Sequence, residues 1–238
     1  MNYKDFAVFF LKETEDQIYL GDKRVNGLFI TIEGPDGAGK TSLLNELYPK
    51  LQLTAKRSIV KTREPGGIPI AEKIRHVILD PSNDRMDDRT EALLYAAARR
   101  QHLVEKVWPA LDEDKIVLCD RFVDSSLAYQ GAGRGIGMEE IAKINEFAIE
   151  GTTPDITLYL DVDSDTGLQR IMKNRTNQID RLDSEGLQFH QRVRHAYLKL
   201  AEANPDRIIK IDARKRLDEV VRDCFYELLT RYPDYFQS

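Results

Sequence analysis

Short apolar segments alternate with longer amphipathic segments over most of the chain. Runs of four to six apolar and β-branched residues predict five strands, at residues 28–33, 58–62, 116–120, 156–161 and 207–211. Helical periodicity or composition marks the segments between and after them, at residues 40–51, 69–79, 89–112, 139–149, 167–173, 185–203 and 216–231. This βαβ alternation predicts an α/β fold with a five-stranded parallel sheet flanked by helices on both faces. Ligands of such folds bind beyond the carboxyl ends of the strands.

A glycine-rich segment follows the first predicted strand. It reads G-P-D-G-A-G-K-T, from Gly34 to Thr41, and fits the phosphate-binding pattern G-x-x-x-x-G-K-[ST] between a strand and a helix. Backbone N–H groups and the helix N-terminus would face the phosphates, Lys40 would neutralise their charge, and Thr41 would offer a hydroxyl to Mg²⁺. We therefore predict a P-loop NTPase fold and ATP contacts from Gly34, Pro35, Asp36, Gly37, Ala38, Gly39, Lys40, Thr41 and Ser42.

The other strand ends narrow the class of nucleotide-binding protein. A guanine-reading N-K-x-D motif does not occur in the sequence, and the third strand ends as I-V-L-C-D-R-F rather than in the acidic pair of many motor ATPases. Asp120, at the end of the third strand, is expected to bind Mg²⁺ or its water ligands. Arg121, the next residue, is expected to bind an anion. Arg63 follows the second strand in K-T-R-E-P-G-G. Two arginines at adjacent strand ends suit a second phosphate group, as phosphoryl transfer between two bound nucleotides requires.

Several motifs in fixed order carry a family resemblance. They are I-T-I-E-G-P-D-G-A-G-K-T, T-R-E-P-G-G, E-A-L-L-Y-A-A-A-R-R, V-L-C-D-R-F-V-D-S-S-L-A-Y-Q-G and D-R-L-D. Over residues 28 to about 230 the chain resembles thymidylate kinases of the bacterial type. The resemblance implies transfer of the γ-phosphoryl group of ATP to dTMP in dTTP synthesis, with Mg²⁺, in a homodimer.

The resemblance also implies an acceptor site. Tyr95 stands where the family stacks an aromatic ring, more often phenylalanine, on thymine. Arg99, one helical turn later, matches the arginine that hydrogen-bonds the base. Ser126 and Gln130 match further contacts to the base edge, and Tyr129 matches the tyrosine that crowds the 2′ position of the sugar.

A basic, polar stretch at residues 173–183 resembles the lid of the family. Members carry an arginine either at the position of Gly37 or in the lid, and this chain resembles the second group, with Arg181 the first choice and Arg175 the second. Asp36 resembles the acid that contacts the acceptor near Mg²⁺. The resulting set of catalytic candidates is Lys40, Asp36, Arg121, Arg181 and Arg175.

Residues 1–27 precede the first strand and add no recognisable chemistry. One interpretation is an appended helix or strand. The other is a natural start near Val25, because V-N-G-L-F-I-T-I-E-G resembles the beginning of a thymidylate kinase. The kinase domain is expected at residues 28–238 in either case.

Composition excludes other classes. A net charge of -5 gives no basic footprint for nucleic acid, and the longest apolar run, residues 6–11, is too short to span a bilayer. Cys119 and Cys224 form no metal-binding or C-x-x-C pattern, so buried thiols in a cytoplasmic protein are expected. Two alternatives stay open: a kinase for another nucleoside monophosphate such as dUMP, and a non-catalytic nucleotide-binding regulator.

Overall fold

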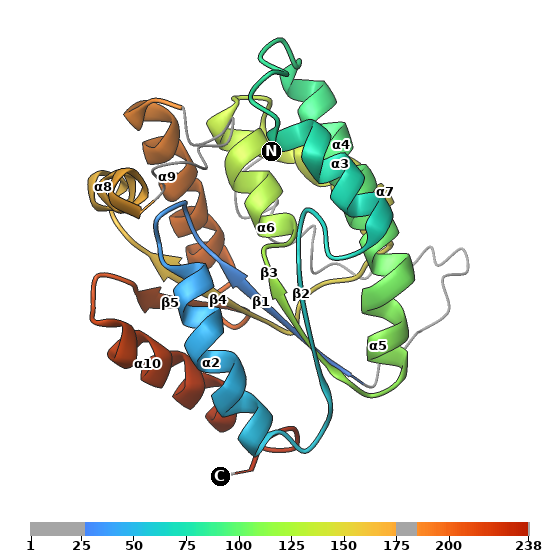
Figure 1. The fold of residues 1–238 in the computed structure, drawn as a ribbon, viewed down its shortest axis with the longest axis vertical. Helices are drawn as coiled ribbons and strands as arrows, with labels where there is room; N and C mark the ends of the chain where they lie inside the picture. The colour runs from blue at the N-terminus through green and yellow to red at the C-terminus, as the bar shows by residue number, and fades with distance from the viewer. Residues whose placement is uncertain (1–26, 175–184, 238) are drawn as a thin grey trace.

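The structure is a computed structural model that describes residues 27–174 and 185–237. Its centre is a parallel five-stranded sheet in the order β2-β3-β1-β4-β5 (Figure 1). The strands are β1 (Leu28–Glu33), β2 (Ile59–Arg63), β3 (Ile116–Asp120), β4 (Ile156–Asp161) and β5 (Ile208–Asp212). All five predicted strands are confirmed, with β2 and β5 each shifted by one residue toward the C-terminus.

Helices cover both faces of the sheet, as predicted (Figure 1). They are α2 (Lys40–Thr54), α3 (Pro69–Leu79), α4 (Asp88–His102), η1 (Leu103–Val107), α5 (Trp108–Asp112), α6 (Val123–Ser126), η2 (Leu127–Gly133), α7 (Met138–Ile149), α8 (Ser164–Asn174), α9 (Leu187–Ala203) and α10 (Leu217–Arg231). Alternate strand residues point to opposite faces. Ile30 and Ile32 of β1 therefore pack with α2 and α10, whereas Phe29 packs with η1, η2, α7 and α9.

Two helical features differ from the sequence prediction. The segment expected as one helix at residues 89–112 is helical throughout, but η1 is a π-helical insert between α4 and α5. Pro109 lies at the start of α5 and has no N–H for a regular helical hydrogen bond, which favours an irregular turn before it. The helical segment at residues 123–133 was not predicted, because its serines and glycines have low helix propensity.

The sheet order positions the site. β1 pairs with β3 on one side and β4 on the other, so the chain changes direction across the sheet at β1. Ligands of open parallel sheets bind at such a switch point. The segments after β1, β2 and β3 consequently meet at one edge, together with the C-terminal half of α4.

Both cysteines are buried and free, as expected. Within residues 27–174 and 185–237, no helix is long and apolar enough to cross a membrane.

Candidate active site

A cleft of about 1330 Å³ opens at this edge of the sheet. It brings together predicted residues from the P-loop, β2, α4, β3 and the segment after β3. The predicted residues that line it are Asp36, Gly37, Ala38, Gly39, Lys40, Thr41, Ser42, Arg63, Tyr95, Arg99, Asp120, Arg121, Ser126, Tyr129 and Gln130. Gly34 and Pro35 are not in its wall, but they contact Lys40 through their carbonyl groups.

The P-loop forms the donor end of the cleft. Gly37 and Gly39 have φ angles of 76° and 91°, which favour glycine, and Gly39 leads directly into α2. Within the described chain no side chain caps the N-terminus of α2. Its first N–H groups and the helix dipole are therefore directed to the loop, where a phosphate would complete their hydrogen bonds.

Lys40 is buried inside the loop. Its Nζ donates to the carbonyl oxygens of Gly34 and Pro35, both at 2.9 Å. Burial and the positive charge of Arg121 together lower the pKa of Lys40 to about 8, although nearby carboxylates such as Asp36 oppose the shift. A phosphate group in the loop would restore the preference for the charged amine.

Arg121 connects the P-loop to the acceptor side. Its Nη2 donates to Asp36 Oδ1 at 2.7 Å and to Tyr129 Oη at 3.1 Å, and Tyr129 Oη donates to Asp36 Oδ2 at 2.7 Å. Its φ of 69° lies in the left-handed region, which is uncommon for a side chain of this size. Burial opposes the charged form, but Tyr129 and Asp36 raise the pKa of Arg121 above its ordinary value. The guanidinium is a fixed cation between the two ends of the cleft.

A buried carboxylate holds the segment that carries Arg121. Glu33, the last residue of β1, accepts from the backbone N–H of Phe122 at 2.7 Å and from Ser125 Oγ at 2.6 Å. It also accepts from Tyr197 Oη of α9 at 2.8 Å. Burial raises the pKa of Glu33, and the nearby Asp124 raises it further.

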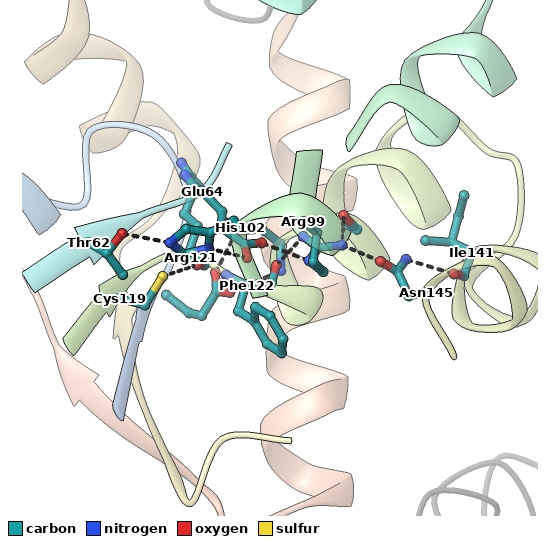
Figure 2. Close-up of polar contacts among 12 residues, drawn as sticks. Thr62, Glu64, Arg99, His102, Cys119, Arg121, Phe122, Ile141 and Asn145 are labelled. Atoms are coloured by element: carbon teal, nitrogen blue, oxygen red, sulfur yellow. Dashed lines mark hydrogen bonds and ion pairs between the residues drawn. The ribbon is translucent and has the colours of Figure 1, made fainter. Parts of the chain in front are cut away.

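Arg99 lies in a second buried network at the acceptor end (Figure 2). Its side chain is 2% exposed; Nε donates to Glu64 at 2.7 Å, and Nη2 to the carbonyl of Phe122 at 3.0 Å. Nη1 donates to Ser126 Oγ at 3.1 Å and to Asn145. These four contacts fix the plane of the guanidinium at the cleft wall.

The network continues to β2 through His102. Its Nδ1 lies 2.9 Å from the other oxygen of Glu64, and its Nε2 lies 2.6 Å from Thr62 Oγ1. Figure 2 shows Thr62, His102, Glu64 and Arg99 in one connected row. The end of α4 is thereby joined to the end of β2, beside the cleft.

The remaining predicted residues differ in their surroundings. Gln130 is buried and donates from Nε2 to Glu91, whereas Tyr95 is partly exposed in the cleft wall. Arg63 is the last residue of β2, and its guanidinium pairs with Glu72 of α3 at 2.8 Å. The structure therefore does not join Arg63 directly to the Arg121 cluster.

The start of α8 packs against the P-loop. A Cβ atom at Gly37 would overlap the backbone of Gly167, so this arrangement has no room for a side chain at that position. Arg170 donates to the carbonyl of Gly37 at 3.4 Å and lines the cleft with Lys173. Arg175 and Arg181, the two lid candidates, lie outside the described residues, as do residues 1–26.

Sequence reasoning missed several residues of the site. Glu64, in the T-R-E-P-G-G motif, and Arg75 of α3 both line the cleft, although the sequence pattern indicated no role for either. Glu33 and Glu91 are buried carboxylates that hold other site residues. An acidic residue in an apolar strand was the available signal for Glu33, because buried carboxylates are rare unless paired.

A P-loop, a fixed arginine beside it and a buried, hydrogen-bonded arginine across the same cleft are the arrangement of a P-loop kinase of small phosphorylated acceptors. The family model described as thymidylate kinase matches residues 32–224. The chain is 71% identical to the thymidylate kinase of Enterococcus faecalis over 212 residues, which are 89% of this chain and 100% of that protein. It is 65% identical to that of Latilactobacillus sakei, over 83% of this chain and 92% of the relative.

A solved structure of the thymidylate kinase from Ehrlichia chaffeensis is also similar. It matches with a TM-score of 0.68 at 33% identity, over 85% of this chain and 98% of the other. The chain belongs to the thymidylate kinase family.

Replacing Lys40 with alanine is expected to abolish most phosphoryl transfer while the fold is retained. The buried amine is the cation inside the loop, and removing one such preorganised group typically lowers turnover roughly 10²- to 10³-fold. Steady-state turnover, with circular dichroism as the control for folding, measures this. Near-normal turnover in a folded variant would contradict the assignment of the loop.

The lowered pKa of Lys40 predicts a pH dependence of ATP binding. The free enzyme loses the charge of Lys40 as pH rises through about 8, so ATP affinity should be constant below this pH and fall above it. Calorimetric titration at increasing pH measures the affinity. The Lys40→Arg variant should lack this fall, because arginine keeps its proton in this range; a flat profile in the unaltered protein would contradict the prediction.

Proposed function

We propose that this chain transfers the γ-phosphoryl group of ATP to dTMP, giving ADP and dTDP. The observation that carries the proposal is a single cleft with the P-loop at one end and the Tyr95 and Arg99 helix at the other, in a member of the thymidylate kinase family. Arg121 contacts the P-loop through Asp36 and the acceptor side through Tyr129. Phosphoryl transfer depends mainly on positioning and charge stabilisation, which this layout suits.

At the donor end, the loop and the N-terminus of α2 would bind the ATP phosphates. Lys40 would turn from the carbonyls of Gly34 and Pro35 to the β- and γ-phosphates. Arg121 would face the acceptor phosphate and the charge that develops on the transferred group, since it is charged and fixed in place before the substrates bind. Asp36 would hold Arg121 and lie in the region of the acceptor sugar and phosphate, near Mg²⁺.

At the acceptor end, Tyr95 would stack on the base and Arg99 would donate to it. Four of the five N–H groups of Arg99 already bond to protein groups, so the guanidinium would need no reorganisation on binding. Ser126 and Gln130 lie beside it in the wall, and Tyr129 would limit the space at the 2′ position of the sugar.

The cleft also fits a magnesium ion. Asp120 Oδ1 is buried and has no hydrogen-bond partner in the described part of the chain, and Thr41 lines the same cleft. Carboxylate and hydroxyl oxygens are ligands that Mg²⁺ accepts, usually with substrate phosphates and water. We propose that Thr41 and Asp120 hold this ion, directly or through its waters, where it neutralises phosphate charge.

Two alternatives are less well supported. A non-catalytic regulator would not need an acceptor pocket with a buried arginine network facing an intact P-loop. A kinase for a different monophosphate is disfavoured by the relatives, which are named thymidylate kinases at 55–71% identity.

We also propose that the protein forms a homodimer through α3, α4 and α7. α4 packs against both α3 and α7, and the three helices lie along one side of the molecule (Figure 1). Large apolar side chains are exposed on them, with Ile70 and Val77 on α3, Leu93 on α4 at 56% exposure and Phe147 on α7 at 88%. An apolar surface of this kind is typical of a protein contact, and the family resemblance supports a second copy as the partner.

Replacing Tyr95 with alanine should weaken the binding of dTMP far more than the binding of ATP. Stacking of a base on an aromatic ring is worth ~1–3 kcal/mol, so the KM for dTMP should rise roughly 5- to 150-fold while the KM for ATP stays nearly constant. Kinetics with each substrate varied at saturation of the other measures this, and Tyr226→Ala on α10 is the matched surface control. An equal rise in the KM values for dTMP and ATP would show that α4 does not form part of the acceptor site. Arg99→Ala should weaken dTMP binding as well, but it should also lower the melting temperature, because Glu64 loses one of its two buried partners.

The dimer proposal predicts a change of mass on substitution of the apolar face. Phe147→Glu combined with Leu93→Glu should convert the dimer to a monomer, since each places a charge in the contact. Light scattering after size exclusion measures the mass. Tyr226→Glu, an equally drastic change on an exposed residue of α10, should leave the dimer intact. A monomeric unaltered protein would contradict the proposal.

A further inference from the structure

Gln130 and Glu91 form a buried pair behind the acceptor end of the cleft. Gln130 lies in η2 and lines the cleft, and its Nε2 donates to Glu91 Oε1 at 2.8 Å. Glu91 lies in the first turn of α4 and has no exposed surface. A carboxylate without contact to water needs partners for its charge.

Arg134 supplies that charge. Its Nη2 lies 3.1 Å from Glu91 Oε2, and its guanidinium also pairs with Asp88 at 3.4 Å and with Glu185. Burial alone would lower the pKa of Arg134, but the carboxylate of Glu91 raises it above its ordinary value. Glu91 therefore forms an ion pair with Arg134, and its carboxylate oxygens accept hydrogen bonds from Arg134 and Gln130.

This pairing fixes the amide of Gln130. Only the NH₂ end of an amide can face a carboxylate, so the orientation follows from chemistry and not from the choice between two similar amide ends. The carbonyl Oε1 must then point away from Glu91. No donor from residues 27–174 or 185–237 reaches Oε1. Among the described residues, Oε1 of Gln130 is therefore an acceptor without a protein donor.

Arg99 supplies the complementary group. Its Nε, both Nη1 hydrogens and one Nη2 hydrogen are used by Glu64, Ser126, Asn145 and the Phe122 carbonyl. One N–H of Nη2 is not used by the described residues. Within the described chain, Arg99 and Gln130 therefore offer the cleft a fixed donor and a fixed acceptor.

A protein donor beside a protein acceptor recognises a base edge that presents an acceptor beside a donor in the matching order. Thymine and uracil both present a carbonyl acceptor, O4, beside a donor, N3–H. Cytosine presents the reverse, an amino donor at C4 beside an unprotonated N3. If the Gln130 carbonyl is locked toward the cleft, it would accept a hydrogen bond from the N3–H of thymine or uracil. With cytosine the same carbonyl would face N3, which is itself an acceptor, so neither atom would have a donor.

We propose that Glu91 is a specificity-determining positioning residue, which locks the Gln130 amide and so selects thymine or uracil over cytosine. This inference rests on the proposed function, because it needs a pyrimidine monophosphate at the acceptor end. A purely structural role, in which Glu91 only anchors Arg134, would affect stability without altering the choice of base.

The test is kinetics of Glu91→Gln with three acceptors. The neutral amide can face Gln130 with either end, so Gln130 becomes free to turn, and Arg134 keeps its pairs with Asp88 and Glu185. The kcat/KM for dTMP and for dUMP should fall by the same factor, about tenfold. The inhibition constant of dCMP, measured in competition with dTMP, should fall or stay constant. Because dTMP becomes a poorer substrate while dCMP binds at least as well, the preference for dTMP over dCMP should decrease by about tenfold or more.

The matched control is Asp88→Asn. Asp88 also pairs with Arg134 from the first turn of α4, but it has no hydrogen bond to Gln130 and is about half exposed, at 49%. Its preference for dTMP over dCMP should equal that of the unaltered protein. An unchanged preference in folded Glu91→Gln, or the same narrowing in Asp88→Asn, overturns the proposal.

A double substitution covers the case in which Glu91→Gln does not fold. Exchanging the two groups, E91Q with Q130E, keeps the net charge and places a carboxylate at the cleft, which accepts from N3–H whichever way it turns. This variant should retain the preference for dTMP over dCMP, and a loss of that preference overturns the proposal.

Gln130→Leu separates this inference from the proposed function. It should raise the KM for dTMP about tenfold or more. If Gln130→Leu leaves the dTMP kinetics unchanged, the base is not read at this wall and the acceptor site itself is wrong. If Gln130→Leu weakens dTMP while Glu91→Gln keeps the preference, the role of Glu91 alone fails.

Discussion

The cleft depends on the placement of one buried carboxylate at the end of the central strand. Glu33 terminates β1 immediately before the P-loop and accepts hydrogen bonds from Phe122, Ser125 and Tyr197. These contacts tie the segment after β3 and the helix α9 to the strand that carries the phosphate loop. Arg121 lies within that segment in a left-handed backbone conformation, which costs energy and persists only where the surroundings determine it. The position of the central cation thus follows from a contact between β1 and the start of α6.

The same principle recurs across the cleft, where arginines in its wall and directly behind it are held by carboxylates. Asp36 holds Arg121, Glu64 holds Arg99, and Glu91 holds Arg134 behind Gln130. Lys40 is different, because it is held by carbonyl dipoles without a full negative charge at hydrogen-bond distance, and its pKa falls to about 8. The arginines are fixed before binding and need little reorganisation, whereas the lysine gains most from an arriving phosphate.

Periodicity predicted the five strands and most of the helices, because the sheet is buried on both faces and its strands are short apolar runs. The P-loop and Arg121 were predictable for a related reason, since they follow strands directly. The partners of Arg99 were not predictable, because Glu64 and Asn145 lie 35 and 46 residues away in sequence and meet it only after folding. The pairing of Arg63 with Glu72 and the packing of Gly37 against Gly167 likewise depend on where helices dock. Local pattern therefore located the segments that line the cleft, and tertiary packing decided which partner each charged side chain has.

The central claim is that one cleft holds a phosphate donor and a dTMP acceptor at the same time. The most direct test is a coupled assay of ADP release by the purified protein with ATP, magnesium and one acceptor at a time from a panel of nucleoside monophosphates. The account predicts that ADP forms rapidly with dTMP, slowly without an acceptor, and much more slowly with purine monophosphates or dCMP. ADP release at one rate regardless of acceptor would show an ATPase without phosphoryl transfer to a nucleotide. No release with any acceptor, despite ATP binding, would contradict the assignment as a kinase.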